Sequence, residues 1–416
     1  MQRISTNMPM LDSRFRMSER DFRMHQIQRG IASSRAIGDL RDAPIDAAHV
    51  TRLDSAGKRV ARYLENIDYI RGRWSQAEGY MNEAITIVQR LRELSIQGAN
   101  TTYSGEDMHY MALEVDALLS ELSMLVNAKG GDGQYLFAGD DVSAPPFLVS
   151  SGRVPGMSRP AITQINYAGD LGRSRVEITD GQTVDSNLRG NEVFWSENQQ
   201  IFGANDTEGF TVTEHNRFLL DGKEVILEPG DNIQNVVRKI NDSGAAVKAS
   251  LDPVTGSLNL KTTLPHQIWL EPAEGTALIA MGLLTETQSS KAPRNWHPDA
   301  VVTGGSLLHQ VLALRDALLS GNQEQIGGSV IGGLDKGLNS LLRNLADLGA
   351  KNERLAFTSS RLGEELEALG DWESRLADLD ITEAITEMSM IEYTQRASYQ
   401  IAGRVLQPTL MDFLRQ

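Results

Sequence analysis

Leucine recurs at every seventh position near the C-terminal end of this sequence. The row runs without a gap through Leu334, Leu341, Leu348, Leu355, Leu362, Leu369 and Leu376. Seven residues are close to two turns of an α-helix, so these side chains would lie along one side of a single long helix. A helix of about 45 residues is roughly 65 to 70 Å long. Since a compact domain is narrower than that, the row predicts a rod.

Heptad rows also occur in the N-terminal part of the sequence. One row, typical of a long second helix, consists of Leu53, Val60, Ile67, Trp74, Met81 and Val88. A third helix is predicted by Met108, Val115 and Leu122, and a shorter first helix by Met10, Met17, Met24 and Ile31. Residues 98–105 are rich in Gly, Asn, Ser and Thr, which predicts a loop between the second and third helices. Those two helices would then form an antiparallel hairpin.

We expect the core of the rod to combine residues from both ends of the chain. The predicted rod core consists of Leu53, Val60, Ile67, Trp74, Met81, Val88, Leu341, Leu348, Leu355, Leu362, Leu369 and Leu376. Residues at such positions bury one apolar stripe against a partner helix. The glycines between Gly327 and Gly333 predict a helix break at the start of the last leucine row.

The middle of the sequence has a different pattern. Between about Gly130 and Gly305, short alternating apolar segments are separated by turn residues such as Asp180-Gly181. The best strand candidates are residues 175–179, 211–213, 223–227 and 257–261, while residues 231–242 have helical spacing. The predicted fold class is therefore α+β: a long antiparallel α-helical coiled-coil rod built from both termini, with an inserted β-rich domain.

The same patterns divide the chain into segments. We predict an N-terminal assembly segment at 1–40, the N-terminal half of the rod at 41–140, an inserted β-rich domain at 141–303, the C-terminal half of the rod at 304–379 and a C-terminal assembly helix at 380–416. An amphipathic helix without a close neighbour is marginal in water and tends to order on association. The two terminal segments are therefore expected to be disordered in the monomer.

Charge and composition exclude several functions. The 416 residues include 40 Lys and Arg against 55 Asp and Glu, and the formal net charge of −15 has the wrong sign for a nucleic-acid partner. The sequence has no cysteine, so thiol chemistry and disulfides are impossible. It also has no run of about 18 apolar residues, so no membrane span is expected. Residues 1–100 carry 16 basic against 12 acidic side chains, opposite in sign to the remainder.

No catalytic or metal-binding pattern stands out. The seven histidines are scattered singly, without the HExxH motif of zinc enzymes. Glu364, Glu365 and Glu367 lie opposite the leucine row, where a solvated helix face explains them. An enzyme hypothesis would use Asp221, Glu224, His215 or Asp252, but their spacing does not single them out. We therefore expect no enzyme and no cofactor. A cytoplasmic coiled-coil signalling rod is a third possibility, but the sequence shows no receptor domain or span.

Several strings resemble one known family. Met1 to Met8, residues 31–48 and residues 90–100 are similar to segments of the flagellar hook-associated protein 3 family, the hook-filament junction proteins related to flagellin. The strongest likeness is Gly133-Gln-Tyr-Leu-Phe-Ala-Gly139. Near the C-terminus, residues 380–388 and 397–410 resemble the terminal helix shared with flagellins. Ala43 departs from the family, which usually has a second Asp there. Residues 218–284 resemble a small strand-helix module inserted in some flagellins, predicted here at about 205–285.

The resemblance implies a structural adaptor subunit of the bacterial flagellum that joins hook to filament and self-assembles through its terminal helices. The alternative is flagellin itself, the filament subunit. The resemblance also implies secretion through type III export, and motility as the process served. The implied partners are hook-associated protein 1, flagellin, further copies of the chain in a ring, and an export chaperone on the C-terminal segment. Neither nucleic acid nor membrane is among them.

In the assembled state that the resemblance implies, apolar residues of the two ends would face each other. The predicted assembly interface consists of Met17, Met24, Ile27, Ile31, Ile381, Ile385, Met388, Tyr399, Ala402 and Leu406.

Overall fold

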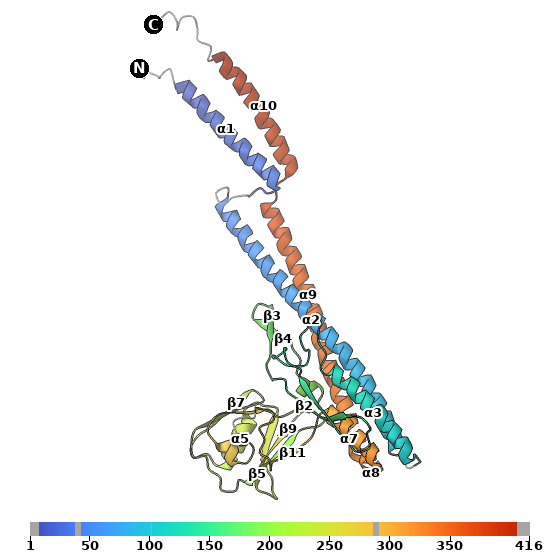
Figure 1. The fold of residues 1–416 in the computed structure, drawn as a ribbon. Coiled ribbons are helices and arrows are strands. Elements are labelled where there is room, and N and C mark those ends of the chain that lie inside the picture. The colour runs from blue at the N-terminus through green and yellow to red at the C-terminus, as the bar shows by residue number, and fades with distance from the viewer. Residues whose placement is uncertain (1–7, 38–42, 101, 286–290, 406–416) are drawn as a thin grey trace, which may run out of the picture. The chain divides into compact units, whose positions relative to one another are not determined.

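Long helices form both ends of the chain, and the β-rich part lies between them in the sequence (Figure 1). The computed structural model describes residues 8–37, 43–100, 102–285 and 291–405. The predicted α+β class, with terminal helices and an inserted β-rich region, is confirmed. The chain separates into two compact units. The terminal unit contains residues 1–65 and 357–416, and the larger unit contains residues 66–356.

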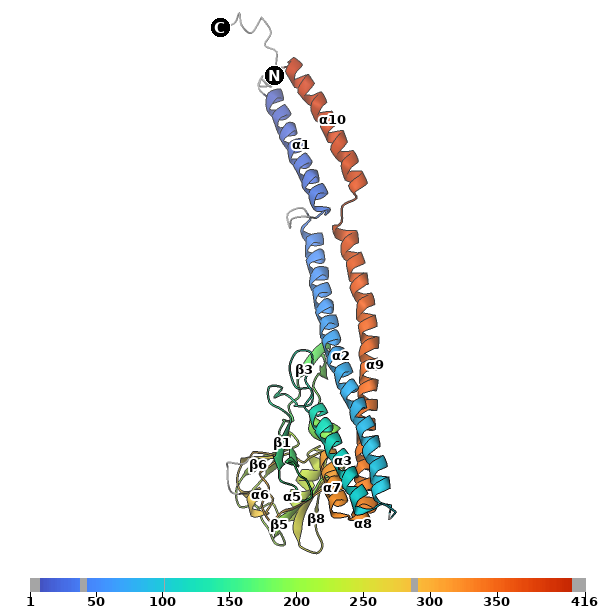
Figure 2. The same ribbon diagram turned by 45° about the vertical axis from the view of Figure 1, so that its right-hand side comes forward.

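The terminal unit is built from two pairs of helices. α1 (Met8–Ser33) lies beside α10 (Ile381–Val405), as both views show (Figures 1 and 2). The first part of α2 (Pro44–Gly98) lies beside the last part of α9 (Ile331–Ala377). Val60 and Leu362 are buried there, 5% and 2% exposed, as expected for heptad positions.

Backbone hydrogen bonds join the two chain segments where these helix pairs meet. The amide of Ala36 donates to the carbonyl of Ala377 (2.7 Å), and the amide of Leu379 donates to the carbonyl of Ser34 (3.1 Å). Arg35 forms an ion pair with Glu373 at 3.2 Å. Asp380 then caps α10, because its Oδ1 accepts hydrogen bonds from the amides of Thr382 and Glu383. The two segments are therefore tied together at one level of the terminal unit.

Helices also form one layer of the larger unit. α3 (Gly105–Leu125) follows α2 after the predicted loop and begins with a capping box between Ser104 and Asp107. α7 (Leu307–Ser320), which the heptad analysis missed, packs against α3. Its buried residues include Leu307, Val311, Leu314 and Leu318, which follow helical spacing.

The predicted helix break near Gly327 is wrong. The chain stays helical from α8 (Gln323–Gln325) through the π-helical segment η1 (Ile326–Val330) into α9. Two glycines of α9 allow close packing instead. A Cβ atom at Gly333 would lie 2.3 Å from Gln310, and one at Gly337 would lie 2.6 Å from Leu307. Glycine therefore lets α9 approach α7 closely.

Two small antiparallel hairpins precede the main β-module. β1 (Phe147–Gly152) pairs with β2 (Ala161–Tyr167), and β3 (Arg175–Thr179) pairs with β4 (Gln182–Asp185). The turn between β3 and β4 contains Gly181 at a φ of +69°, a conformation that glycine adopts at no steric cost. A short helix, α4 (Gly190–Val193), follows.

The β-module contains two antiparallel sheets and a shared core. One sheet has the order β11-β5-β9-β8, from β5 (Gln200–Asp206), β8 (Val247–Leu251), β9 (Ser257–Thr262) and β11 (Val301–Thr303). The other has the order β10-β6-β7, from β6 (Asn216–Leu220), β7 (Lys223–Leu227) and β10 (Leu270–Glu274). α5 (Ile233–Asp242) and α6 (Ala277–Ala280) complete the module. Their buried side chains form one cluster between Ile201 and Leu284.

Most elements predicted for the β-rich middle are present. The strands at 175–179, 223–227 and 257–261 and the helix within 231–242 are confirmed. The strand at 211–213 is wrong, because only one isolated bridge, from Thr211 to Asn232, forms there. Val212 still donates to the carbonyl of Asp231 and accepts from the amide of Gly230, both at 2.8 Å, but the residues after it are irregular, so no strand forms.

Candidate assembly surface

Polar contacts hold α1 and α10 together in the terminal unit. Arg20 donates a hydrogen bond to the hydroxyl of Ser398. The side-chain amide of Gln395 donates to Asp21 Oδ1 at 2.5 Å. Arg23 forms an ion pair with Glu387 at 2.8 Å, with side chains that are 68% and 39% exposed. These three contacts are spread over several turns, so the helices lie side by side over much of their length.

The N-terminal residues predicted for the assembly interface line the side of α1 that is partly covered. Met17, Met24, Ile27 and Ile31 are all half-buried. They recur at spacings of three, four and seven residues, which places them on one face of the helix. Within the described part of α1, this stripe is the one the heptad row identified.

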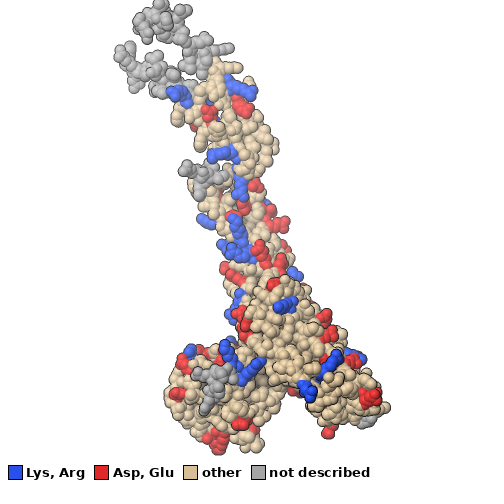
Figure 3. Space-filling model, viewed as in Figure 1, with Lys and Arg blue, Asp and Glu red and all other residues tan. Residues whose placement is uncertain are grey.

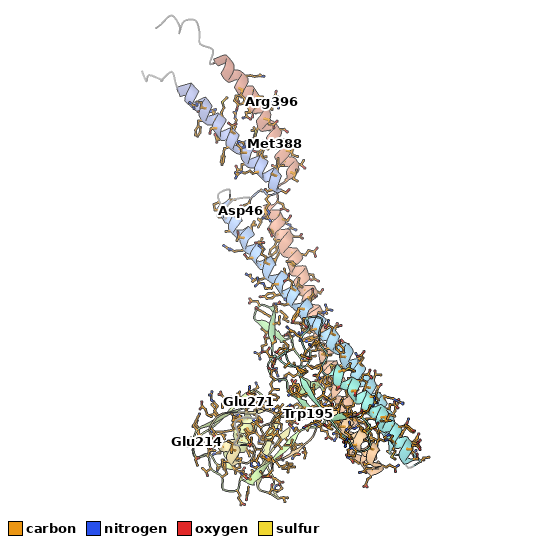
Figure 4. All side chains as sticks on the ribbon, in the orientation of Figure 1. Asp46, Trp195, Glu214, Glu271, Met388 and Arg396 are labelled. Carbon is orange, nitrogen blue, oxygen red and sulfur yellow. The ribbon has the colours of Figure 1, made fainter. Side chains whose placement is uncertain are left out.

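The C-terminal residues of the predicted interface are less covered. Met388 is half-buried, whereas Ile381 and Ile385 are each 47% exposed and Tyr399 is 54% exposed. Met388 and Arg396 lie at two levels along α10 (Figure 4). Ala402 belongs to α10, but its side chain lies outside the described residues, and so does Leu406 as a whole. Ala384, which the sequence analysis did not select, is the most buried residue described on this helix, at 4% exposed.

Further apolar side chains on α1 point away from this stripe. Phe15 and Phe22 are 71% and 64% exposed. Each lies two residues before Met17 or Met24, and two residues turn an α-helix by roughly 200°. The two rings are therefore on the side opposite the methionines. Their spacing of seven residues was visible in the sequence, but the methionine row drew the prediction to one face only.

The described part of α10 has the same two-sided character. Met390 is 67% exposed and Tyr393 is 77% exposed. Tyr393 lies nine residues after Ala384, which is two and a half turns, so it projects from the opposite side of the helix. Both helices thus keep large apolar groups in water after packing against each other. Large apolar side chains that stay exposed together can mark contact sites between proteins.

Most residues of the predicted rod core are buried within the unit to which they belong. The buried members are Val60, Ile67, Trp74, Met81, Val88, Leu341, Leu348, Leu355 and Leu362. Leu53 and Leu369 are half-buried. Leu376 contradicts the prediction, since it is 40% exposed while its neighbour Ala377 is 1% exposed. A straight helix drifts by about 20° per heptad, so Ala377 takes the buried position at the end of the row.

The string 133–139 lies in the larger unit. Phe137 is fully buried and meets Phe194 edge to face, with ring centroids 4.9 Å apart. Phe147 joins the same cluster, 5.9 Å from Phe194 and 5.2 Å from Tyr167. Burial raises the pKa of the Tyr167 hydroxyl well above its usual value. The string therefore anchors the chain after α3 onto the first hairpin.

Backbone geometry explains the glycine that ends this string. Gly139 has a φ of +81°, and a Cβ atom there would lie 2.2 Å from Asp170 Oδ1. The carboxylate of Asp170 accepts hydrogen bonds from the amides of Asp140 (2.6 Å), Asp141 (3.1 Å) and Gly172 (3.0 Å). Three amide donors hold one carboxylate, so this loop is a fixed structural feature.

An ion pair attaches the start of the string to α2. Arg73 is 7% exposed, and its Nη1 lies 2.7 Å from Asp132 Oδ2 and 3.1 Å from Gln134 Oε1. Burial acts to raise the pKa of Asp132, but the hydrogen bond from the Gln134 amide and the charge of Arg73 outweigh it, so this pKa lies below its usual value. A buried arginine with several acceptors fixes the position of a loop well.

The residues of the enzyme hypothesis have separate partners. Asp221 binds the buried His266, with 2.8 Å between its Oδ2 and Nε2, whereas the exposed His215 lies 3.3 Å from Glu228. Glu224 interacts with Arg217 and Asp252 with Thr255. Among the described residues, no group of three or more His, Asp or Glu could hold a metal ion. None of the described helices is long and apolar enough to cross a membrane.

A cavity of about 480 Å³ in the larger unit is lined by residues of α2, α9 and the β-rich part. Its charged groups largely neutralise one another. Arg173 pairs with Asp185 at 3.0 Å, Arg189 with Glu192 at 2.5 Å and Lys351 with Asp347 at 2.6 Å.

Both ends of the chain match sequence models of known protein families. The sequence model for the bacterial flagellin N-terminal helical region matches residues 4–141, and the model for the bacterial flagellin C-terminal helical region matches residues 331–414. Together they cover more than half of the 416 residues. The matched ends are the helical regions of bacterial flagellins. This chain belongs to the flagellin-like family.

Individual relatives include both flagellins and hook-associated proteins. Flagellin A of Vibrio anguillarum is 26% identical over 338 residues, which is 80% of this chain and 77% of that protein. Flagellar hook-associated protein 3 of Escherichia coli is 26% identical over 152 residues, 36% of this chain and 47% of that protein. A crystal structure of flagellar hook-associated protein 3 from Legionella pneumophila has a TM-score of 0.48 at 18% identity, covering 79% of this chain and 98% of that one.

Proposed function

We propose that this chain is a structural subunit of the bacterial flagellum that joins the hook to the filament. In this proposal it assembles through α1 and α10. The observation that carries it is the apolar surface these helices keep exposed, with Phe15, Phe22, Met390 and Tyr393 all more than 60% in water. Burying such surface between subunits gains about 25 cal/mol per Å². The match of the ends to flagellin helical regions supports the same use.

The likeness to hook-associated protein 3 favours the junction over the filament. Relatives of that name match 36% and 39% of this chain. The string 133–139, which resembles the junction family, adds to this support. The partners that follow are hook-associated protein 1, flagellin and further copies of the chain in a ring, with an export chaperone on the C-terminal segment. The subunit would then be secreted through type III export and reside in the flagellum.

Flagellin is the second candidate, and a specific observation favours it. Relatives named flagellin align with 80% to 97% of this chain, more than the hook-associated proteins do. In that case the same terminal helices would build the filament itself.

Deletion of the gene separates the two candidates. A strain without a junction subunit should make hooks without filaments and release polymerisable flagellin into the medium. Electron microscopy and analysis of the medium measure both effects. If the strain instead lacks its principal filament protein while the junction proteins remain on the hooks, the chain is a flagellin. Normal filaments in the deletion strain would contradict both.

Truncation tests the role of the terminal helix. Removing residues 397–416 deletes the Arg20–Ser398 contact and the end of α10, but none of the described core of the larger unit. The truncated chain should stay folded, with an unchanged main thermal transition, and should not complement the deletion strain. Normal incorporation of the truncated chain would refute assembly through this helix. Disorder of the segments 1–40 and 380–416 before assembly stays a prediction, which limited proteolysis of the purified monomer would test.

A further inference from the structure

Two exposed faces of the terminal unit carry opposite charge. The basic face belongs to α2 and consists of Arg52, Arg59 and Arg62. The acidic face belongs to α9 and consists of Glu364, Glu367 and Asp371. All six residues are exposed. In the view of Figure 3, the blue of basic side chains lies over this part of α2 and the red of acidic ones over this part of α9.

Both faces are turned away from the contact between the two helices. Val60 and Leu362 mark that contact, since both are buried in the terminal unit. At about 100° per residue, the basic face lies roughly 80° to 160° around α2 from Val60. By the same count, the acidic face lies roughly 140° to 200° around α9 from Leu362. Neither face can therefore neutralise the other within one copy.

The six side chains have no ion pair with any residue in the described part of the chain. Neighbouring charges of the same unit do find partners. Lys58 pairs with Asp54 at 2.8 Å, and Arg35 pairs with Glu373 at 3.2 Å. Other exposed charges near the faces, such as Glu65 beside Arg62 and Arg375 beside Asp371, also have no ion pair with a described residue, but each face keeps an excess of one sign.

The whole terminal unit shows the same division of charge. Residues 1–65 carry 12 Lys and Arg against 8 Asp and Glu. Residues 357–416 carry 5 Lys and Arg against 11 Asp and Glu. One copy therefore presents a basic N-terminal segment beside an acidic C-terminal segment. The basic segment of one copy is complementary in charge to the acidic segment of a second copy in the same orientation.

Apolar groups accompany the acidic face. Phe357 is 74% exposed and lies seven residues before Glu364, in the same row of the helix. Trp372 is 57% exposed and follows Asp371 directly. Aromatic side chains are enriched at contacts between proteins, where they supply buried area that charges alone do not.

We infer that the basic face of α2 in one copy packs against the acidic face of α9 in the next copy. The contact uses two different surfaces, so it is heterologous and propagates around a ring or along a helical tube instead of closing a two-fold dimer. This inference rests on the proposed function, because it names the partner of the assembling subunit as a second copy of this chain.

Charge reversal tests the contact in the deletion strain. Arg59→Glu with Arg62→Glu puts acidic residues on both faces, and Glu364→Arg with Glu367→Arg puts basic residues on both. Each double variant should lower the fraction of hooks that carry filaments by about tenfold, because like charges then meet between copies. Combining all four substitutions exchanges the two signs and restores complementarity. The fourfold variant should recover filaments to within about threefold of the unaltered chain.

A matched control carries the same change of charge elsewhere. Arg153 and Arg159 are exposed in the loop between β1 and β2 of the larger unit, so Arg153→Glu with Arg159→Glu should leave filament counts unchanged. Thermal melting of each purified variant should equal that of the unaltered chain, which excludes misfolding. The inference is overturned if either double variant complements fully, or if the fourfold variant does no better than the doubles. Failure of the unaltered chain to restore filaments would instead overturn the proposed function.

Discussion

The larger unit and the terminal unit use the same seven-residue period and bury it to different extents. In the larger unit Ile67, Trp74 and Met81 are at most 2% exposed. In the terminal unit Met17 is only half-buried, and Phe15 on the same helix is 71% exposed. The seven-residue period determines which side chains lie on the same face of a helix. The number of neighbouring elements determines how many of those side chains are buried.

The neighbours account for this difference. In the larger unit, α3 and α7 pack together, and sheet residues add further cover. A helix with one neighbour covers a stripe on one side only. Among the described residues of the terminal unit, α1 packs along α10, so a second apolar stripe on either helix stays exposed. That second stripe is the surface on which the proposed assembly depends.

A charge in the buried row should have the largest effect. Leu355 is 1% exposed in the larger unit, and Leu355→Asp buries a carboxylate without a partner. We expect a loss of about 3 to 5 kcal/mol in the free energy of unfolding. Thermal or urea denaturation followed by circular dichroism measures it.

The neighbouring Phe357 provides the control for that substitution. Phe357 is 74% exposed two residues further along the same helix, so Phe357→Asp should change the free energy of unfolding by no more than about 0.5 kcal/mol. Equal melting temperatures of the two variants would mean that the leucine row is not buried. The two sides of α9 would then not differ in burial.

The two faces of α1 should separate stability from assembly. Phe15→Ser with Phe22→Ser removes exposed rings, so the melting curve should not change, while complementation of a deletion strain should fail. Met17→Ser with Met24→Ser removes half-buried groups and should lower both the stability of the α1–α10 pair and assembly. Full complementation by the phenylalanine variant would show that the exposed stripe is not an assembly surface.

The heptad rows made the helical part of this fold predictable. Each of the rows from Leu53 and from Leu334 specifies one long helix, and the loop at 98–105 follows from its glycines and polar residues. The end of the leucine row was not predictable from a strict period of seven. Ala377 replaces Leu376 in the buried position because a real helix has 3.6 residues per turn.

The remaining misses have local causes. α7 has continuous apolar residues instead of a clean heptad row, since Leu307, Leu308, Val311 and Leu312 are buried on more than one side. Gly327 and Gly333 were interpreted as helix breakers, although glycine also permits close helix contacts, a role that only tertiary structure reveals. The exposed Phe15 was missed because a heptad period shows which side chains share a helix face but does not show how many other helices cover that face.

Burial also separates two histidine–carboxylate pairs in the β-module. The His266–Asp221 pair is buried, with side chains 8% and 13% exposed, and Asp221 Oδ1 also accepts a hydrogen bond from the Trp269 amide at 2.9 Å. Burial acts to lower the pKa of His266, but the hydrogen bond to Asp221 and its charge outweigh it, so the pKa is raised. Stability from this pair is present at low pH and is lost as the pH rises through the raised pKa.

Asp221→Asn should remove that pH dependence. As the pH rises above the ordinary histidine pKa of about 6.5, the unaltered chain should lose stability that the variant does not lose, and the Asn can still accept from the Trp269 amide. Burial lowers the pKa of His309, which has the opposite sign, so the difference between the two chains is the quantity to measure. Parallel melting temperatures across this range in both chains would show that His266 carries no charge in the fold.

The exposed pair should have the smallest effect. His215 and Glu228 are 47% and 58% exposed and lie 3.3 Å apart, where water screens their interaction. His215→Ala should therefore change the free energy of unfolding by less than about 0.5 kcal/mol. Swimming in soft agar should remain normal, because the exposed His215 lies outside the proposed assembly helices α1 and α10. A strain that is paralysed while the variant melts normally would mean that exposure is a poor guide to importance in this module, and it would return His215 to the list of catalytic candidates.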